Sequence, residues 1–370
     1  MKKLGFGLMR LPLTDVNDGK SIDIERVKVM ADRYMEEGFT YFDTAAPYHG
    51  QQSEVAFREA VAKRYPRESY TVTDKFSMWM INEEMDMETF FNGQLERLGV
   101  DYVDIYLLHA MNRNRFEDAK KLGVFDFVNQ KKAEGKIKHL GFSFHDTADA
   151  LETILNEWPE AEYVQLQMNY LDWEDEKVQS RKCYELALAH DKQILVMEPV
   201  KGGGLATVSP AVESLFKDYN PKASVASWAV RFVASLKNVV MVLSGMSDEA
   251  QMEDNLSYMK EFEPLNDEEL AIVTKAAEMI RADIAIPCTA CRYCVDDCPM
   301  QISIPEYFRI YNRLKQLQST QLNDRRHEYA RYAEEHGKAS ECIECGMCEG
   351  HCPQNIEIRK MLKDVASCLE

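Results

Sequence analysis

Eight of the chain's ten cysteines are spaced in a way that suits metal binding. They form two runs of one pattern, C-x2-C-x2-C-x3-C-P, whose first cysteines lie 54 residues apart in a chain of 370 residues. Cysteines at this spacing bind [4Fe–4S] clusters, because three thiolates two residues apart wrap a loop around one face of the cluster. The eight residues are Cys288, Cys291, Cys294 and Cys298 in the first run, and Cys342, Cys345, Cys348 and Cys352 in the second.

The fourth cysteine of each run stands apart from the other three and precedes a proline. In bacterial two-cluster ferredoxins, which use this spacing, the fourth cysteine binds the cluster of the other run. We therefore predict two [4Fe–4S] clusters, one on Cys288, Cys291, Cys294 and Cys352, and one on Cys342, Cys345, Cys348 and Cys298.

Zinc and disulfide bonds are the alternatives for these cysteines. Zinc sites usually draw two C-x2-C pairs from separated knuckles, whereas each run here places four sulfurs within eleven residues. Disulfide bonds need an oxidising compartment, and the chain begins without the apolar core of a signal peptide. Clusters are therefore favoured. The two other thiols, Cys183 and Cys368, are expected to be a small core residue and part of a mobile tail.

Composition argues for a cytoplasmic protein without nucleic-acid or membrane partners. Hydrophobic residues make up 45% of the chain, enough for a substantial core, and the formal net charge is -18. Nucleic acids and anionic membranes attract clustered Lys and Arg, which this acidic balance argues against. No apolar run approaches the length of a membrane span.

Residues 1–282 alternate short apolar runs with longer amphipathic stretches. The apolar runs do not alternate with polar residues, which is typical of parallel strands buried on both faces. Eight strand–helix units over about 250 residues predict an α/β fold, a closed (β/α)8 TIM barrel. An open doubly wound sheet is the alternative, but no G-x-G-x-x-G follows the first strand. The predicted strands are 5–8, 41–43, 70–75, 103–109, 139–143, 164–168, 193–198 and 239–243.

Helical patterns lie between the strands, for example at 24–37, 53–64, 87–98, 172–190 and 224–235. A last helix at 265–281 precedes an abrupt rise in cysteine and proline. We therefore place a domain boundary near residue 282. Residues 283–370 are expected to form a small, ferredoxin-like, mainly α-helical iron–sulfur domain, in which the insert 304–338 is helical in pattern.

Four residues near the predicted strand ends could reduce a carbonyl group. Asp43, Lys75 and His109 end three successive strands, and Tyr48 follows Asp43 on the next loop. Catalytic groups of a barrel lie at the carboxyl ends of its strands. Tyrosine can donate a proton to a developing alkoxide, and a nearby ammonium, held by a carboxylate, is expected to lower the tyrosine pKa. Such residues also cap helices, but four complementary types at successive strand ends favour catalysis.

The sequence around these residues resembles that of the aldo-keto reductase family, and the resemblance extends over essentially residues 1–280. It rests on the segments 43–48, 101–109, 135–143 and the opening 5–12, together with Lys75. It implies a (β/α)8 barrel that transfers hydride from NAD(P)H to a small-molecule carbonyl substrate. The whole chain resembles family members whose barrel carries a C-terminal domain of the ferredoxin type.

The resemblance also implies contacts to the nicotinamide cofactor. Residues of the fifth to seventh strands fall where the family binds the nicotinamide. A lysine–glycine segment falls where the family covers the pyrophosphate. The region at and after the end of the eighth strand falls where the family binds the adenosine phosphate. In this order the residues are Ser143, Gln165 and Met197; Lys201, Gly202 and Gly203; and Ser244, Gly245, Gln251 and Asn255.

One of these positions departs from the pattern of NADP-preferring relatives. They often place a lysine and an arginine where this chain has Gly245 and Gln251. Such cations bind the 2′-phosphate of NADPH, and neutral residues lose that interaction. We therefore expect weak discrimination for NADPH and use of NADH.

A nicotinamide site and two clusters leave three functions open. The barrel could reduce an aldehyde or ketone while the clusters are structural or regulatory. The clusters could instead exchange electrons with a ferredoxin or flavodoxin-like carrier, or the protein could be a non-catalytic redox sensor. The intact Asp43, Tyr48, Lys75 and His109 favour an enzyme, and the acidic charge would repel an acidic carrier. Carbonyl reduction is therefore ranked first.

The substrate itself is not predicted. Specificity in such barrels comes from the loops after the strands. Trp79 and Met111 could line an apolar wall, and Arg113 and Arg115 could meet an anionic substrate, although loop arginines are more often merely solvated.

Overall fold

The computed structural model describes residues 2–16, 18–82, 84–283, 285–316 and 322–370. The chain forms two compact units. The first comprises residues 1–174, 179–199 and 226–270, and the second comprises 175–178, 200–225 and 271–370. The boundary near residue 282 stays a prediction, and two internal segments group with residues 271–370 in the second unit.

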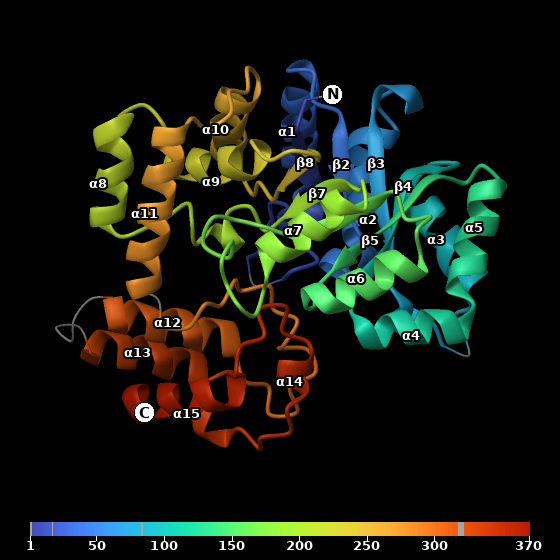
Figure 1. Cartoon of the computed structure of the whole chain (residues 1–370). Helices are drawn as coiled ribbons and strands as arrows, with labels where there is room; N and C mark the ends of the chain where they lie inside the picture. Colours follow the sequence, from blue (N-terminus) through green and yellow to red (C-terminus); the bar gives the residue numbers. More distant parts are fainter. Residues whose placement is uncertain (1, 17, 83, 284, 317–321) are drawn as a thin grey trace. The chain divides into compact units, whose positions relative to one another are not determined.

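Eight parallel strands close into a barrel in the first unit (Figure 1). Each strand pairs with the next one along the chain, and β8 pairs with β1. The predicted (β/α)8 barrel is confirmed, and each predicted strand is found within two residues at either end. The strands are β1 Leu4–Gly7, β2 Tyr41–Asp43, β3 Thr71–Phe76, β4 Val103–Met111, β5 Ile137–Phe144, β6 Tyr163–Gln167, β7 Gln193–Met197 and β8 Val239–Ser244.

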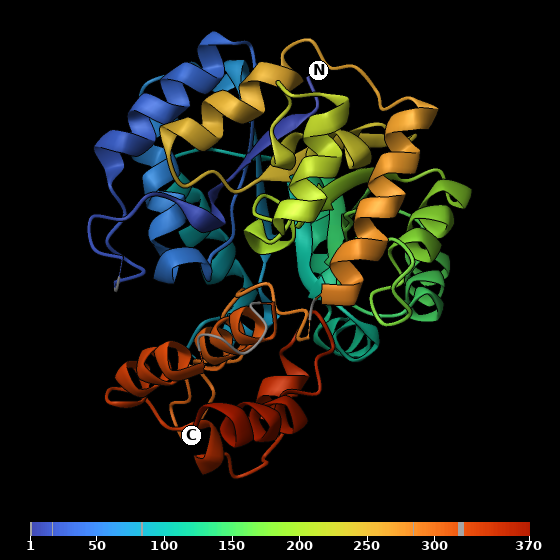
Figure 2. The same ribbon diagram turned by 90° about the vertical axis from the view of Figure 1, so that its left-hand side faces the viewer.

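Helices follow the strands, as a parallel barrel requires, because the chain must return to the same end of the barrel before each new strand begins. α1 and α10 lie side by side (Figure 2), and the ion pairs Arg26–Glu249 and Arg33–Glu253 join them. The helices after β1 to β6 and around β8 are α1 Ile24–Glu36, α2 Gln52–Phe57, α3 Met87–Leu98, α4 Arg113–Leu122, α5 Val124–Ala133, α6 Ala148–Glu157, α7 Ser180–Ala189, α9 Val225–Ala234 and α10 Glu249–Met259.

The prediction of a helix over 172–190 is wrong in its first half, because α7 begins only at Ser180. Asp172 is buried, and its carboxylate accepts hydrogen bonds from the amides of Gln167 and Asn169. The Asn169 side chain in turn accepts bonds from the backbone of Leu171 and Asp172. These local bonds hold the chain in turns where the apolar pattern alone suggested a helix.

The second unit is mainly helical, as predicted. Its helices are α8 Pro210–Tyr219, α12 Ile304–Gln316, α13 Leu322–Ala333, α14 Met347–Gly350 and α15 Ile358–Leu369, and α11 Asp267–Asp283 leads into it. α12, α13 and α15 pack around a core that includes Tyr307, Phe308, Leu362 and Val365. None of the helices in the described ranges combines the length and apolar character that a membrane crossing demands.

Candidate active site and cysteine pockets

Lys75 and Asp43 form a buried ion pair near the carboxyl ends of β3 and β2. The Nζ atom of Lys75 lies 2.6 Å from Oδ1 of Asp43 and donates a second bond of 2.7 Å to the carbonyl of Thr44. Oδ2 of Asp43 accepts a 3.1 Å bond from Gln165. Burial raises the pKa of Asp43, and the Lys75 ammonium opposes that rise. These bonds fix the direction of the ammonium.

Tyr48 and His109 lie beside this ion pair. The turn Tyr48–Gln51 follows β2, and His109 lies near the end of β4. Nζ of Lys75 is 4.9 Å from the centre of the Tyr48 ring, and the rings of Tyr48 and His109 are 5.9 Å apart. The structure thus brings together all four residues that the sequence singled out for catalysis.

The pKa of the Tyr48 phenol is raised well above its ordinary value. Burial is the main cause, and the negative charges of Asp43, Asp74 and Glu198 add to it. The predicted net lowering of the Tyr48 pKa is therefore wrong for this structure, because burial of the phenol raises it. Tyr48 keeps its proton at neutral pH, which a proton donor needs.

His109 is held in its neutral form. Burial lowers its pKa well below the ordinary value, and the charge of Lys75 lowers it further. Its Nδ1 atom lies 2.8 Å from the hydroxyl oxygen of Ser77, so Nε2 is left to face a substrate. No sequence pattern predicted this bond, because Ser77 lies just after β3, which ends at Phe76.

Two further side chains lie next to His109. The ring of Trp79 is 5.0 Å from the His109 ring, and the guanidinium of Arg115 lies 4.7 Å above the Trp79 ring. Arg115 also donates a 2.7 Å bond to the carbonyl of Ala110. Trp79 is 48% exposed, so it can form a wall of an open substrate site.

The residues expected at the nicotinamide lie at the carboxyl ends of β5, β6 and β7. Ser143 and Gln165 are buried. The hydroxyl of Ser143 accepts a 2.7 Å bond from the backbone N–H of Ala110 and keeps its own hydrogen to donate. Met197 ends β7 and pairs with Gln167 of β6. Donors and acceptors of these types fit a carboxamide.

The residues expected at the adenosine lie at the end of β8 and on α10. Asn255 donates a 2.7 Å bond to the backbone carbonyl of Gln251. Its Oδ1 atom is buried and has no hydrogen-bond partner among the residues that the structure describes. A buried acceptor needs a donor, which an amino group of a bound adenine would supply. Ser244, the last residue of β8, is also buried, and the Cβ of any residue replacing Gly245 would contact Arg10.

Lys201, Gly202 and Gly203 belong to the second compact unit, and their contact with the pyrophosphate stays a prediction. Nζ of Lys201 donates a 2.9 Å bond to Oε1 of Gln354, and Gly202 packs against the backbone of Thr289. The structure therefore groups these three residues with the cysteine-rich segment.

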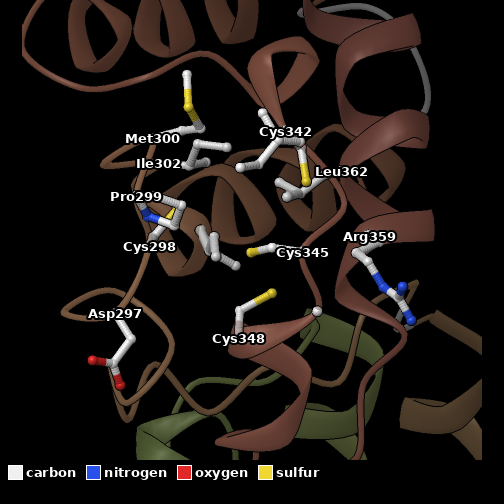
Figure 3. A pocket seen from close by; sticks show the side chains of 13 residues that line it. Asp297, Cys298, Pro299, Met300, Ile302, Cys342, Cys345, Cys348, Arg359 and Leu362 are labelled. Carbon is white, nitrogen blue, oxygen red and sulfur yellow. The ribbon is translucent and has the colours of Figure 1, made fainter.

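Two pockets of the second unit are each lined by four cysteines. The Cys342 pocket, of about 330 Å³, has the sulfurs of Cys345 and Cys348 pointing toward its middle and Asp297 and Arg359 at its edge (Figure 3). The Cys288 pocket measures about 310 Å³. Each pocket joins three cysteines of one run to the fourth of the other: Cys342, Cys345, Cys348 and Cys298 in the first, and Cys288, Cys291, Cys294 and Cys352 in the second.

The two cysteine loops share one backbone conformation. Ala290 and Glu344 occupy the same place in the two runs and have φ angles of 53° and 56°. Arg292 and Gly346 are likewise equivalent, with φ angles of 67° and 79°. Left-handed residues turn a chain tightly, and here they let three cysteines line one pocket.

The donor set of the pockets fits clusters. All ten cysteines lie in the described ranges and none is in a disulfide bond. Within those same ranges, no three His, Cys, Asp or Glu side chains converge on a point where a single metal ion could bind. Four cysteines line each pocket, which is the number of thiolates that a [4Fe–4S] cluster binds. Burial raises the pKa of Cys288 to about 12, so bound iron would be needed to keep it a thiolate.

Two protein-family models match this chain. Residues 3–278 match the model of the Aldo/keto reductase family, and residues 287–357 match that of a 4Fe-4S dicluster domain.

Two curated relatives show the extent of the similarity. An aldo-keto reductase of Mycolicibacterium smegmatis is 29% identical over 163 residues, which cover 40% of this chain and 54% of the relative. The NADH-specific methylglyoxal reductase of Escherichia coli is 28% identical over 203 residues, which cover 46% of this chain and 60% of the relative. The chain thus spans little more than half the length of these relatives.

Solved structures share the barrel. An aldo-keto reductase from Bacillus halodurans in its holo form has a TM-score of 0.59 at 21% identity, over 74% of this chain and 91% of that one. An aldo-keto reductase from Klebsiella pneumoniae in complex with NADPH has a TM-score of 0.55 at 18% identity, over 74% and 90%. At these identities the likeness shows the fold alone.

Proposed function

We propose that this protein, which belongs to the aldo/keto reductase family, reduces an aldehyde or ketone to an alcohol with hydride from NAD(P)H. One observation carries the proposal: Tyr48, Lys75 and His109 meet at the carboxyl ends of the strands. The similarity to the NADH-specific methylglyoxal reductase makes small dicarbonyl compounds the first substrates to test.

The side chains divide the work of proton transfer. Bound NAD(P)H supplies hydride to the carbonyl carbon. The Tyr48 hydroxyl donates its proton to the carbonyl oxygen, so that one hydride and one proton convert the carbonyl to an alcohol. Lys75, held by Asp43, stabilises the phenolate that Tyr48 leaves behind. Nε2 of His109 donates a hydrogen bond to the carbonyl oxygen and orients it.

The cofactor contacts follow from the same barrel end. Ser143, Gln165 and Met197 are proposed to bind the nicotinamide. Ser244, Gly245, Gln251 and Asn255 are proposed to bind the adenosine half. Asp248 and Gln251 bind each other, with Nε2 of Gln251 3.0 Å from the Asp248 carboxylate. A carboxylate here and the lack of a cation at Gly245 and Gln251 disfavour a 2′-phosphate, so NADH is expected to serve.

Two [4Fe–4S] clusters are proposed for the Cys288 and Cys342 pockets. The four-cysteine lining of each pocket and the match to a dicluster domain support this number. The proposed boundary near residue 282 falls between the two matched regions. Free thiols suit a reducing compartment, so we propose that the protein lies in the cytoplasm.

Cluster-linked electron transfer with a ferredoxin or flavodoxin-like carrier is the second candidate function. It is favoured by the presence of two complete cysteine pockets, which exceed what a small helical unit with its own core needs for stability.

Stopped-flow spectroscopy of the anaerobically reconstituted protein tests both functions. Carbonyl-dependent oxidation of NADH or NADPH with unchanged cluster absorbance supports carbonyl reduction by the barrel. Bleaching of the clusters by the nicotinamide alone supports the second function. Failure to oxidise either nicotinamide with a panel of aldehydes, ketones and dicarbonyls contradicts the first.

A further inference from the structure

A buried lysine after β7 contacts a residue that lines the Cys288 pocket. Lys201 belongs to the same compact unit as residues 271–370 and is 6% exposed. Its ammonium donates a 2.9 Å bond to Oε1 of Gln354. Gln354 is itself buried and lines the Cys288 pocket two residues after the ligand Cys352. The charge is therefore one side chain away from the pocket.

The backbone next to Lys201 is pressed against the loop that carries the first cysteine. Gly202 has a φ angle of 62°, and a Cβ at this position would lie 2.2 Å from the carbonyl oxygen of Thr289. Thr289 follows Cys288 directly. Only glycine permits this approach without displacing the loop. Lys201 is thus fixed near the pocket by its neighbour's backbone as well as by its own hydrogen bond.

The ammonium of Lys201 lies one side chain from the Cys288 pocket, because Gln354, which accepts its hydrogen bond, lines that pocket. A buried cation acts through a low dielectric and is little screened by salt. A [4Fe–4S] cluster becomes more negative by one charge when it takes up an electron, and nearby charge is one of the factors that set its reduction potential.

In the described structure no lysine lines either pocket, and each has one arginine among its lining residues, the exposed Arg292 at the Cys288 pocket and Arg359 at the Cys342 pocket. Arg359 is 43% exposed and pairs with Glu349 at 2.7 Å. The Cys288 pocket has in addition the buried Lys201, which reaches it through Gln354. An exposed and neutralised guanidinium has a much weaker field than a buried ammonium. The two pockets are alike in their cysteines and differ in this charge.

We propose that Lys201 raises the reduction potential of the cluster in the Cys288 pocket by stabilising its reduced state, so that the two clusters differ in potential. The inference goes beyond carbonyl reduction, and it rests on the cluster proposed for this pocket. It also assigns Lys201 a role other than the pyrophosphate contact that the family resemblance implies.

Lys201→Met removes the charge and keeps an unbranched side chain. In an anaerobic redox titration followed by visible absorbance and electron paramagnetic resonance, the equilibrium constant for reduction of one cluster is expected to fall about tenfold or more, which is ~59 mV for one electron. The other cluster should keep its potential. Lys201→Arg keeps the charge, so its cluster should have nearly the same reduction potential as in the wild-type protein.

Lys177→Met is the matched control. Nζ of Lys177 lies 3.4 Å from the carbonyl oxygen of Asn355, so it contacts the same segment as Lys201, but its side chain is exposed. Because solvent screens an exposed charge, its removal should change the equilibrium constant much less than tenfold. Equal shifts in the two lysine variants contradict the proposal.

Gln354→Glu keeps Lys201 and places a carboxylate beside its ammonium, which neutralises the charge. This variant therefore tests the charge even if Lys201→Met folds poorly. The same cluster should again become harder to reduce. Iron analysis of the wild-type protein separates the two hypotheses: iron for one cluster instead of two removes the proposed site and this inference together. If Lys201→Met and Gln354→Glu have their full iron and unshifted potentials, the inference alone is overturned. If Lys201→Met then also binds NADH more weakly, Lys201 contacts the pyrophosphate instead.

Discussion

Nζ of Lys75 lies 2.6 Å from Oδ1 of Asp43, and their side chains are only 0% and 6% exposed. Taking two charges out of water is costly, and here each charge compensates the other. The pair therefore links stability to catalysis, because the carboxylate of Asp43 both compensates the buried charge of Lys75 and fixes the direction of the ammonium that faces Tyr48.

Lys75→Met should destabilise the barrel by about 3–5 kcal/mol, since it leaves the Asp43 charge buried without its partner. Chemical denaturation followed by circular dichroism measures the change. The double variant Asp43→Asn/Lys75→Met should regain part of that stability but no reductase activity.

Lys138→Met is the control for this pair. Lys138 bonds the Asp104 carboxylate at 2.8 Å, yet it is 48% exposed. Its removal should cost about 1 kcal/mol or less. If Lys75→Met costs no more than Lys138→Met, the buried pair does not have the stabilising role described here.

Tyr48→Phe should lower kcat for carbonyl reduction by about 100-fold or more, because only the proton donor is lost. The dissociation constant of NADH, measured by fluorescence titration, should stay the same. Tyr163→Phe makes the same chemical change at the amino end of β6 and should leave kcat unaltered. Full activity in Tyr48→Phe would remove Tyr48 from the proposed role.

The pH profile of kcat/KM should be flat around neutrality. A general acid loses activity as pH rises through its pKa, and the raised pKa of Tyr48 moves that loss to strongly alkaline pH. The lowered pKa of His109 means that this residue stays neutral until the solution is well below pH 6.5, its ordinary value. Steady-state rates at saturating NADH across this range check both directions. An alkaline limb near pH 8 would contradict the proposed state of Tyr48.

The sequence was sufficient to find the four catalytic candidates because parallel strands bring their carboxyl ends to one place. Asp43, Lys75 and His109 could be located from strand ends alone. Ser77 was missed, since its bond to His109 depends on rotamers that a pattern does not specify. The sign of the Tyr48 pKa shift was wrong for a related reason: it depends on how deeply the phenol is buried.

Contacts between residues far apart in the sequence could not be predicted. The family resemblance implied a pyrophosphate contact for Lys201, which stays a prediction, whereas the bond of its amine to Gln354, 153 residues further along the chain, was not predicted. No local pattern announces such a contact. The cysteine spacing, in contrast, repeats so closely that equivalent residues such as Gln301 and Asn355 have the same left-handed backbone, with φ angles of 53° and 50°.

Gln251→Arg should raise the preference for NADPH over NADH by about tenfold, or ~1.4 kcal/mol, because it adds a cation where a 2′-phosphate would lie. The ratio of kcat/KM for the two cofactors measures it. Gln251→Met also breaks the bond to Asp248 but adds no charge, so it should leave the ratio unchanged. A roughly hundredfold NADPH advantage in the unmodified protein would contradict the predicted use of NADH.

The crossed lining of the two pockets predicts which cysteines act together. Cys352→Ala should lose one cluster, and therefore about half of the iron, because a [4Fe–4S] site needs its fourth thiolate. Cys288→Ala/Cys352→Ala should lose no more iron than Cys352→Ala, since both residues line the same pocket. Cys288→Ala/Cys298→Ala should lose nearly all of it, since these residues line different pockets although they belong to one run.

Cys368→Ala, in the same unit but outside both pockets, should keep the full iron content. Iron and sulfide analysis of the purified anaerobic variants decides between the two arrangements. If each run instead bound its own cluster, Cys288→Ala/Cys298→Ala would retain half of the iron and Cys288→Ala/Cys352→Ala would lose all of it. The two double variants therefore exchange their outcomes, so the result does not depend on how efficiently any one protein is reconstituted.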